Sequence, residues 1–294
     1  MHRKSRRTTV DTGRRLLHWR ERIVIGSRLP ALGASTPGMS RIQFLDVPID
    51  LLSMREAVEI AVDSMHRRVL RRHVALNVAK FVKMRSDQEL HRDVVESDII
   101  GIDGMGIIAG LRLFGCRQAE RVSGVDLMER LLERCEREGL RPFVLGARRE
   151  VLERALAVAR IRWPRLSFAG CRDGYFTVED EPAVVAEIAR SGADCLFVAM
   201  PTPRKERFLR RHIEALGVPF VMGVGGSIDV LAGAVQRAPG WMQRAGLEWL
   251  FRLMQEPRRM LWRYASTNTQ FAAILLRALA ARLAGRPVIR YEPN

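Results

Sequence analysis

The chain has 294 residues, a formal net charge of +16 and an apolar fraction of 47%. This apolar fraction is ordinary for a globular protein and excludes wholesale disorder. The four cysteines are far apart and form no C-x-x-C pair, which argues against a zinc or redox motif, and no run of about 18 uncharged apolar residues predicts a membrane span.

The positive charge is concentrated at the two ends of the chain. Residues 1–40 hold nine Arg or Lys against two acidic residues, and residues 241–294 hold nine Arg against three Glu. Basic ends on a nearly balanced middle indicate an acidic partner, either an anionic membrane or a nucleic acid. The alternative is a general arginine bias of the source genome. Residues 1–40 are predicted to be a flexible basic arm that ends in a Ser-, Gly- and Pro-rich linker.

Residues 41–240 alternate between short apolar runs and longer helical patterns. The predicted strands are 73–78, 98–103, 141–146, 166–171, 194–200 and 219–225, and predicted helices between them include 124–138, 148–161, 180–191 and 203–215. Each strand is short, apolar and bounded by Gly, Pro or charge, as buried parallel strands are. This alternation predicts an α/β core with a Rossmann-like, doubly wound, mostly parallel sheet.

Residues 241–294 change in character, and no strand is expected there. The pattern predicts a helix, a break near Pro257, a second helix, and a further helix over 267–285. Phe271, Ile274, Leu275, Ala278 and Leu279 fall on one stripe of that last helix. A basic amphipathic helix appended to a core is typical of a membrane-surface element. A packing helix or a contact in a homo-oligomer is the alternative.

The first candidate site follows the strand at 98–103. Asp103 stands at its carboxyl end, where open α/β sheets bind ligands. Gly104 and Gly106 would let a ligand approach the backbone at the start of the next helix. Asp103 is interpreted either as a general base for a sugar hydroxyl or as an ordinary helix N-cap. Arg121 would neutralise a diphosphate leaving group, or else it is a surface arginine.

The later strand ends carry further candidates. Gly146 ends a strand in what resembles half of a nucleotide-binding turn. Thr202 can cap the helix that carries Lys205 in its anion-friendly first turn. Gly225 and Gly226 stand in a glycine-rich strand end whose amides could cradle a nucleotide or phosphate.

Several motifs are absent. The chain has no G-x-G-x-x-G, G-K-[ST], H-E-x-x-H, G-x-S-x-G or D-x-D sequence, and its histidines are scattered. The sequence therefore predicts a reaction that uses neither a metal nor another cofactor.

Taken together, these motifs resemble the TagA/CpsF/WecG family of bacterial glycosyltransferases. The resemblance runs from about Leu45 to about Asn268. It is carried by the strings LNVAKFV, IDGMGI, ERVSGVDL, FVLGA, DGYF, PTPRKERF, GVGGSIDVLAG, RAPGWMQRAGLEWLFRL and QEPRR. Members transfer N-acetylmannosamine, its uronic acid or glucose-type sugars from a UDP-sugar to a polyprenyl-diphosphate-linked acceptor.

The resemblance implies a role for individual residues. Asp103 matches the proposed base and Arg121 a donor-site arginine, while Asn77 and Tyr175 lie in strings expected at the donor site. Arg252 and Arg259 match basic residues thought to reach the acceptor diphosphate. Helix geometry adds Arg263, because positions 252, 259 and 263 fall within about 20° of one line on a continuous helix and could form one cationic stripe. The chain departs from the family at two positions near the donor sugar, with Ala75 in place of a frequent Thr and Lys205 in place of a frequent Gln.

The sequence thus predicts an inverting, metal-independent glycosyltransferase of cell-surface or exopolysaccharide synthesis. We expect it in the cytoplasm, peripheral on the inner face of the cell membrane, with no nucleic acid as partner. The alternative reading of the basic ends is a nucleic-acid-binding protein with an α/β core, although no recognition motif supports it. A nucleotide-sugar epimerase is disfavoured because its glycine-rich turn is missing.

Overall fold

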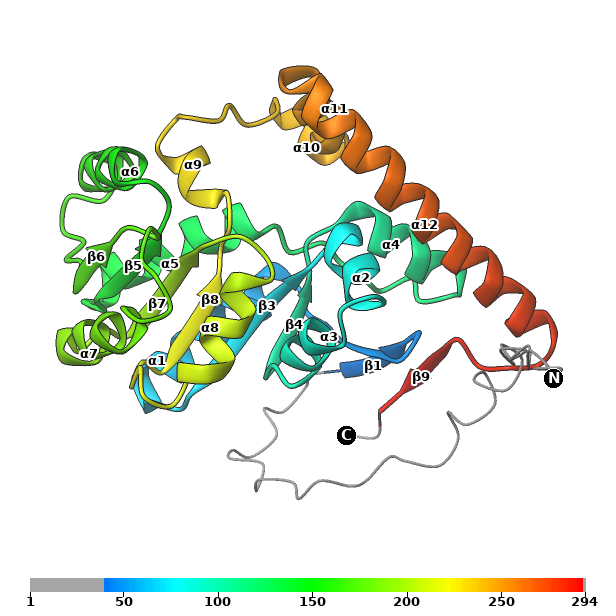
Figure 1. Ribbon diagram of the computed structural model, residues 1–294, viewed down its shortest axis with the longest axis horizontal. Coiled ribbons are helices and arrows are strands. Elements are labelled where there is room, and N and C mark those ends of the chain that lie inside the picture. The colour runs from blue at the N-terminus through cyan, green and yellow to red at the C-terminus, as the bar shows by residue number, and fades with distance from the viewer. Residues whose placement is uncertain (1–39, 293–294) are drawn as a thin grey trace, which may run out of the picture. The chain divides into compact units, whose positions relative to one another are not determined.

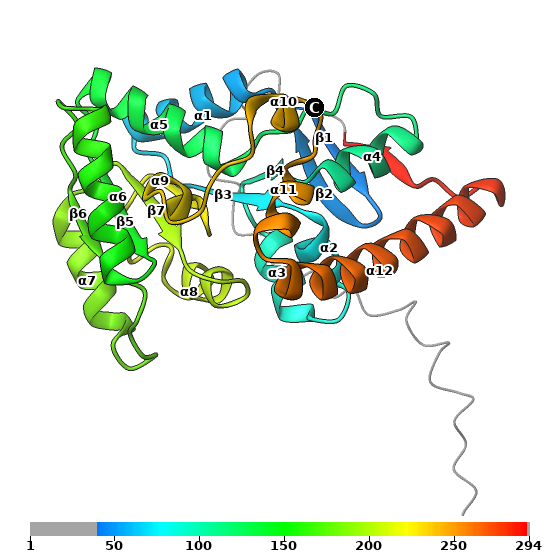
Figure 2. The ribbon, with the colours of Figure 1, turned by 90° about the horizontal axis from the view of Figure 1, so that it is seen from above.

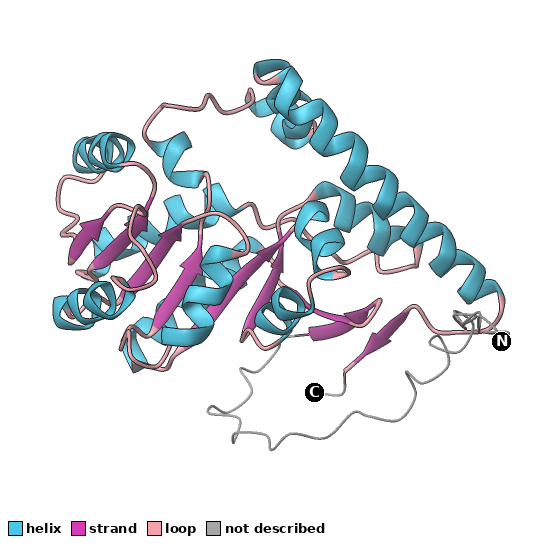
Figure 3. Ribbon diagram, in the orientation of Figure 1, coloured by secondary structure: helices cyan, strands magenta, loops and turns pink. Residues whose placement is uncertain are grey.

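The computed structural model describes residues 40–292, so the predicted basic arm lies outside the described residues except for Ser40. A sheet of six parallel strands has the order β4–β3–β8–β7–β5–β6 (Figure 1, Figure 3). These strands are β3 (Arg71–Leu76), β4 (Ile99–Ile102), β5 (Pro142–Gly146), β6 (Gly170–Arg172), β7 (Cys195–Ala199) and β8 (Phe220–Gly223). A strand lies at each of the six predicted places, but the one predicted over 166–171 is shorter and shifted, because only Gly170, Cys171 and Arg172 pair with β5.

Helices cover both faces of this sheet, because successive strand residues point to opposite sides. One face packs against α1 (Met54–Arg67), α5 (Gly124–Glu138), α6 (Arg149–Arg162) and α9 (Ser227–Leu231). The other packs against α2 (Val78–Met84), α3 (Gln88–Val95), α7 (Glu181–Ser191) and α8 (Arg204–His212). On β7, Phe197 reaches the first face and its neighbour Val198 the second. The doubly wound α/β fold is confirmed.

A second, smaller sheet is antiparallel. It consists of β2 (Val47–Leu51), β1 (Ser40–Phe44) and β9 (Ile289–Tyr291), in that order. In β9, Ile289 pairs with Phe44, and Tyr291 pairs with Ile42. The expectation that strands stop after Gly240 is therefore wrong. A three-residue strand among arginines and prolines carries too little periodicity to be seen in the sequence.

The C-terminal region is helical up to β9. It contains α10 (Gly240–Arg244), α11 (Glu248–Gln255) and α12 (Pro257–Leu283). The predicted break is confirmed, because Glu256 is non-helical and Pro257 opens α12. The expected third helix is not separate, since α12 continues without interruption to Leu283.

Helix α12 runs alongside α2 and α4 (Met105–Leu113) (Figure 1, Figure 2). Phe271 and Ala278 are buried there, and Phe271 meets Phe81 of α2 edge-on, with ring centroids 5.6 Å apart. The apolar stripe that was predicted to lie on a membrane thus faces the protein core. The alternative interpretation, a packing helix, is the correct one for these residues.

Among residues 40–292, no helix is both long enough and apolar enough to cross a membrane.

Candidate functional site

The candidate donor-site residues follow the carboxyl ends of the six parallel strands. Because these strands run in one direction, the loops after them meet at one edge of the sheet. Asn77 follows β3; Asp103, Gly104 and Gly106 follow β4; Gly146 ends β5; Tyr175 follows β6; Thr202 and Lys205 follow β7; and Gly225 and Gly226 follow β8. The topology therefore gathers at one edge residues that are up to 149 positions apart in sequence (226 − 77).

Asp103 is held at this edge by backbone on both sides. Its own N–H donates to the carbonyl of Leu76 at 2.9 Å, and its Oδ1 accepts from the N–H of Gly124 at 3.1 Å. Gly124 opens α5, so the carboxylate faces the positive end of that helix. The carboxylate does not cap α4, whose N-cap is Gly104. It therefore accepts a hydrogen bond at the N-terminus of α5 instead of α4.

Arg121 lies directly beside Asp103. Its Nε donates to the Asp103 carbonyl at 2.7 Å, and its Nη2 forms an ion pair with Glu248 of α11. Glu248 also lies 3.5 Å from Arg237, which pairs with Asp126 at 2.6 Å. Arg121 is thus part of a chain of alternating charges that fastens α11 to the core. The sequence indicated neither Glu248 nor Arg237, because both come from distant segments.

The space that side chains would need at the glycines after β4 is occupied by other residues of the protein. A Cβ on Gly104 would lie 3.1 Å from Cα of Asn77, and one on Gly106 would lie 2.4 Å from a methyl group of Val78. Asn77 caps α2 by accepting from the N–H of Lys80 at 3.0 Å. These glycines therefore let the starts of α2 and α4 pack together, which explains them without a ligand.

The glycines at the two other strand ends differ from one another. Gly146 has φ +123°, and a Cβ there would lie 2.4 Å from the carbonyl oxygen of Ala199, so only glycine fits. Gly225 also has a positive φ, but no described atom lies within 4 Å of the place its Cβ would take. Of the two, Gly225 leaves open space at the edge of the sheet.

The loop after β7 differs from its predicted role. Thr202 does not cap α8, because Pro203 is the N-cap residue and the Thr202 hydroxyl donates to Glu206 at 3.1 Å. Lys205 is buried rather than displayed on the helix start, and its Nζ lies 2.8 Å from Glu206. Glu206 also holds Lys80 of α2 at 2.9 Å. The loops after β3 and β7 are thus joined by a buried cluster of charges.

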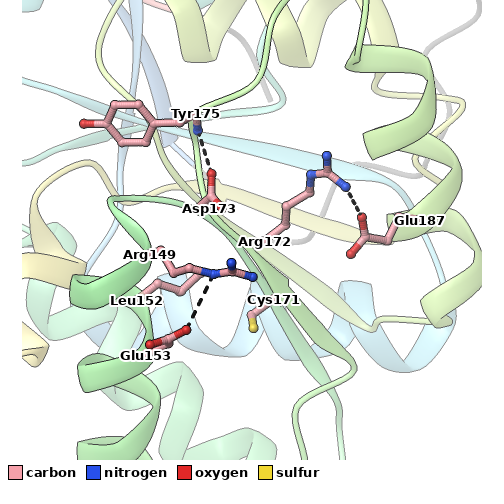
Figure 4. A pocket seen from close by; sticks show the side chains of 8 residues that line it. All are labelled: Arg149, Leu152, Glu153, Cys171, Arg172, Asp173, Tyr175 and Glu187. Atoms are coloured by element: carbon pink, nitrogen blue, oxygen red, sulfur yellow. Dashed lines mark hydrogen bonds and ion pairs between the residues drawn. The ribbon is translucent and has the colours of Figure 1, made fainter.

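A hollow lies at the far end of the sheet from Asp103. It has a volume of about 360 Å³ and is lined by Arg149, Leu152, Glu153, Cys171, Arg172, Asp173, Tyr175 and Glu187 (Figure 4). β6 is five strand positions from β4, which amounts to about 24 Å at about 4.8 Å per strand. Tyr175 is the only predicted site residue in its lining, so this hollow is separate from the place where Asp103 and Arg121 meet.

The basic residues expected at the acceptor lie on two helices. Arg252 is exposed on α11, whereas Arg259 and Arg263 belong to α12 and their side chains lie outside the described residues. Glu256 breaks the helix between them, so the calculated alignment of Arg252 with the other two on a continuous helix does not apply.

No group of three or more His, Cys, Asp or Glu side chains within the described part of the chain is arranged to hold a metal ion. The metal-free reaction remains a prediction from the sequence.

The fold defines a doubly wound α/β protein, a class in which ligands bind beyond the carboxyl ends of the strands. Residues 42–285 match the model of the Glycosyl transferase WecG/TagA/CpsF family. The match includes the whole parallel sheet and all of α12. The protein belongs to this family and is a glycosyltransferase.

Proposed function

We propose that the protein is an inverting glycosyltransferase that moves a sugar from a UDP-sugar to a polyprenyl-diphosphate-linked acceptor, at the cytoplasmic face of the membrane. The product would serve cell-surface or exopolysaccharide synthesis. The observation that carries this proposal is the position of Asp103, whose carboxylate accepts a hydrogen bond from the first amide of α5 and whose backbone carbonyl accepts one from Arg121. Membership of a transferase family favours this function over nucleic-acid binding.

In the proposed reaction, Asp103 accepts the proton of an acceptor hydroxyl. The hydroxyl oxygen then forms a bond to the anomeric carbon of the donor from the face opposite UDP. The bond from that carbon to the UDP oxygen breaks, and UDP leaves with the electron pair. A single base suffices for such an inversion, whereas retention requires a second, nucleophilic group.

Arg121 is suited to the leaving group. A guanidinium has five N–H donors, and the contacts to Asp103 and Glu248 engage two of its nitrogens. The remaining donors support an additional contact to a diphosphate, which binds arginine strongly. The open backbone at Gly225 supports a second contact for the nucleotide part.

The membrane contact is assigned to the outward side of α12. Trp262, Leu276 and Leu283 are 80%, 67% and 83% exposed. At 100° per residue they lie within a sector of about 60°, opposite the stripe that packs on the core. An exposed apolar line with a tryptophan at one end, on a segment rich in arginine, suits the headgroup region of an anionic leaflet.

Replacing Asp103 by Asn tests the chemistry. We expect release of UDP from a UDP-sugar and a lipid-diphosphate acceptor to fall about 10²–10⁴-fold, the usual contribution of a general base. UDP binding and thermal unfolding should stay near wild type. Asp63→Asn, the same change at a half-exposed aspartate of α1, should leave turnover unchanged. Near-wild-type turnover of Asp103→Asn would remove this residue from the mechanism.

Leu276→Glu combined with Leu283→Glu tests the membrane surface. Point variants are needed because deleting α12 would also uncover the core around Phe271. We expect the double variant to stop sedimenting with anionic vesicles, while Ile161→Glu, at an equally exposed apolar residue of α6, sediments like wild type. If the double variant still sediments fully, α12 is not the membrane element and residues 1–40 become the better candidate.

A further inference from the structure

A buried cluster of two lysines and one glutamate lies next to the proposed donor site. Lys80 of α2 and Lys205 of α8 both bind the same oxygen, Oε1 of Glu206, at 2.9 and 2.8 Å. The three side chains are almost completely shielded from water, and Lys205 is only 5% exposed. Two ammonium groups and one carboxylate leave the cluster with an excess of one positive charge.

This excess charge is costly to keep away from water. Burial is the main reason that the pKa of Lys205 falls to about 8, and the nearby Lys80 lowers it further. Burial alone would raise the pKa of Glu206, but Lys80 and Lys205 outweigh it and hold that pKa at about 2. At neutral pH these values leave Lys205 and Glu206 charged, so the single carboxylate of Glu206 is the only negative charge that the two lysines of the cluster share.

The fold makes room for this arrangement. Gly223 ends β8, the strand between β3 and β7, and a Cβ there would lie 2.3 Å from Cε of Lys205. The stem of Lys205 therefore occupies the space that any other residue at position 223 would need. The cluster lies among the ends of three adjacent strands, at the same edge as Asp103.

Lys205 has one hydrogen-bond donor left for a ligand. An ammonium group has three N–H bonds, and Glu206 and Thr202 accept two of them, at 2.8 and 3.2 Å. One remaining donor suits a single anionic oxygen. A diphosphate is better matched by the several donors of Arg121 and by backbone amides.

We propose that Lys205 and Lys80 form an anion subsite for the donor sugar, and that Lys205 makes the enzyme prefer a UDP-sugar with a carboxylate on its ring. The inference rests on the proposed function, because it needs a UDP-sugar at this edge. The carboxylate supplies the counter-charge that the cluster lacks, and a neutral hexose would leave Lys205 uncompensated. Lys205 acts here on specificity and takes no part in bond breaking.

Lys205→Gln is the decisive variant, since glutamine keeps a hydrogen-bond donor and removes the charge. The measurement is kcat/KM for a UDP-hexuronate and for the matching UDP-hexose, with Lys83→Gln, an exposed lysine of α2, as control. We expect wild type and Lys83→Gln to prefer the hexuronate. Lys205→Gln should lose about 10–100-fold on the hexuronate, the range for a hydrogen bond to a charged group, and little on the hexose.

The other outcomes overturn the inference. An equal loss on both donors would mean that Lys205 contacts the diphosphate that they share. No loss on either, or a wild-type preference for the hexose, would mean that no sugar anion binds there. UDP binding, measured by calorimetry for each variant, detects misfolding separately. Should wild type bind UDP but release none from any donor, the proposed function fails instead.

Discussion

The two ends of the parallel sheet hold their charged residues in different ways. At the β4–β3 end, Arg121 and Glu248 are about 20% exposed and join segments far apart in the chain. At the β5–β6 end, Arg172 and Glu187 are 36% and 39% exposed and border an open hollow. Charges that are partly removed from water must be held by partners, and perturbed groups gather at functional sites. The partly buried charges and the open hollow therefore mark opposite ends of the sheet.

The largest effect on stability is expected from Phe271→Ala, which removes the contact of α12 with Phe81 at the β4–β3 end. Truncating a buried phenylalanine costs about 3–5 kcal/mol. Urea unfolding measures this loss directly. Leu276→Ala, on the outward side of the same helix, should change stability by less than about 0.5 kcal/mol. Equal losses in the two variants would show that α12 does not pack on the core as described.

A smaller effect is expected from acid at His73. This imidazole is fully buried in β3, and burial, followed by the charge of Lys80, lowers its pKa from 6.5 to about 4. Because the folded pKa is the lower one, the stability contribution is fully present above pH 6.5 and is lost as pH falls towards 4. The shift corresponds to about 3 kcal/mol in total, of which about 2 kcal/mol is lost between pH 7 and pH 5.

His73→Met removes this titration while keeping a side chain of similar size. The stability difference between pH 7 and pH 5, measured by urea unfolding, should shrink by about 2 kcal/mol relative to wild type. Glu206 does not interfere, because its folded pKa of about 2 places its loss below pH 4.5. An unchanged difference would mean that His73 is not held neutral by its burial.

Glu248→Gln should cost about 1–2 kcal/mol, less than the change in the core, because the ion pair with Arg121 is only partly buried. The loss arises because Arg121 would lose its ion pair with Glu248, and Arg237 would keep only its pair with Asp126. Chemical unfolding gives the magnitude. A variant as stable as wild type would show that these charges do not fasten α11 to the core.

The smallest effect is expected from the same substitution at the other end of the sheet. Glu187→Gln breaks an exposed ion pair with Arg172 and should change stability by less than about 0.5 kcal/mol. Turnover should also stay at the wild-type level. If Glu187→Gln costs as much as Glu248→Gln, the contrast between the two ends does not hold.

The parallel sheet was predictable because its signals are local. The short apolar runs that became β5 and β7 are bounded by charge, glycine or proline, and helix α5 begins and ends where its periodicity does. β9 was not predictable, since its three residues become a strand only by pairing with β1. The side of α12 that faces the core was also not predictable. Apolar residues lie on two opposite sides of this helix, and periodicity does not say which side packs on the core.

For the site, the sequence located the strand ends but not the contacts between them. Asp103 and Arg121 were expected near a ligand, and the structure brings them together. Glu248 is 127 residues from Arg121, and no local pattern links them. No local pattern indicates the ion pairs of α8 either. Arg207, for example, pairs with Asp87 and Glu89, because α3 packs beside α8.

The pairing of β9 with β1 also sets the order in which the chain assembles. Ile42 can pair with Tyr291 only after Tyr291 has been synthesised. At about 5–20 residues per second, synthesis of Tyr291 follows that of Ile42 by about 12–50 s. During synthesis the open edge of β1 is therefore available to other strands, and the surface that later receives α12 is still uncovered. We therefore expect chaperones that bind nascent chains to bind this protein mainly at β1 and β2.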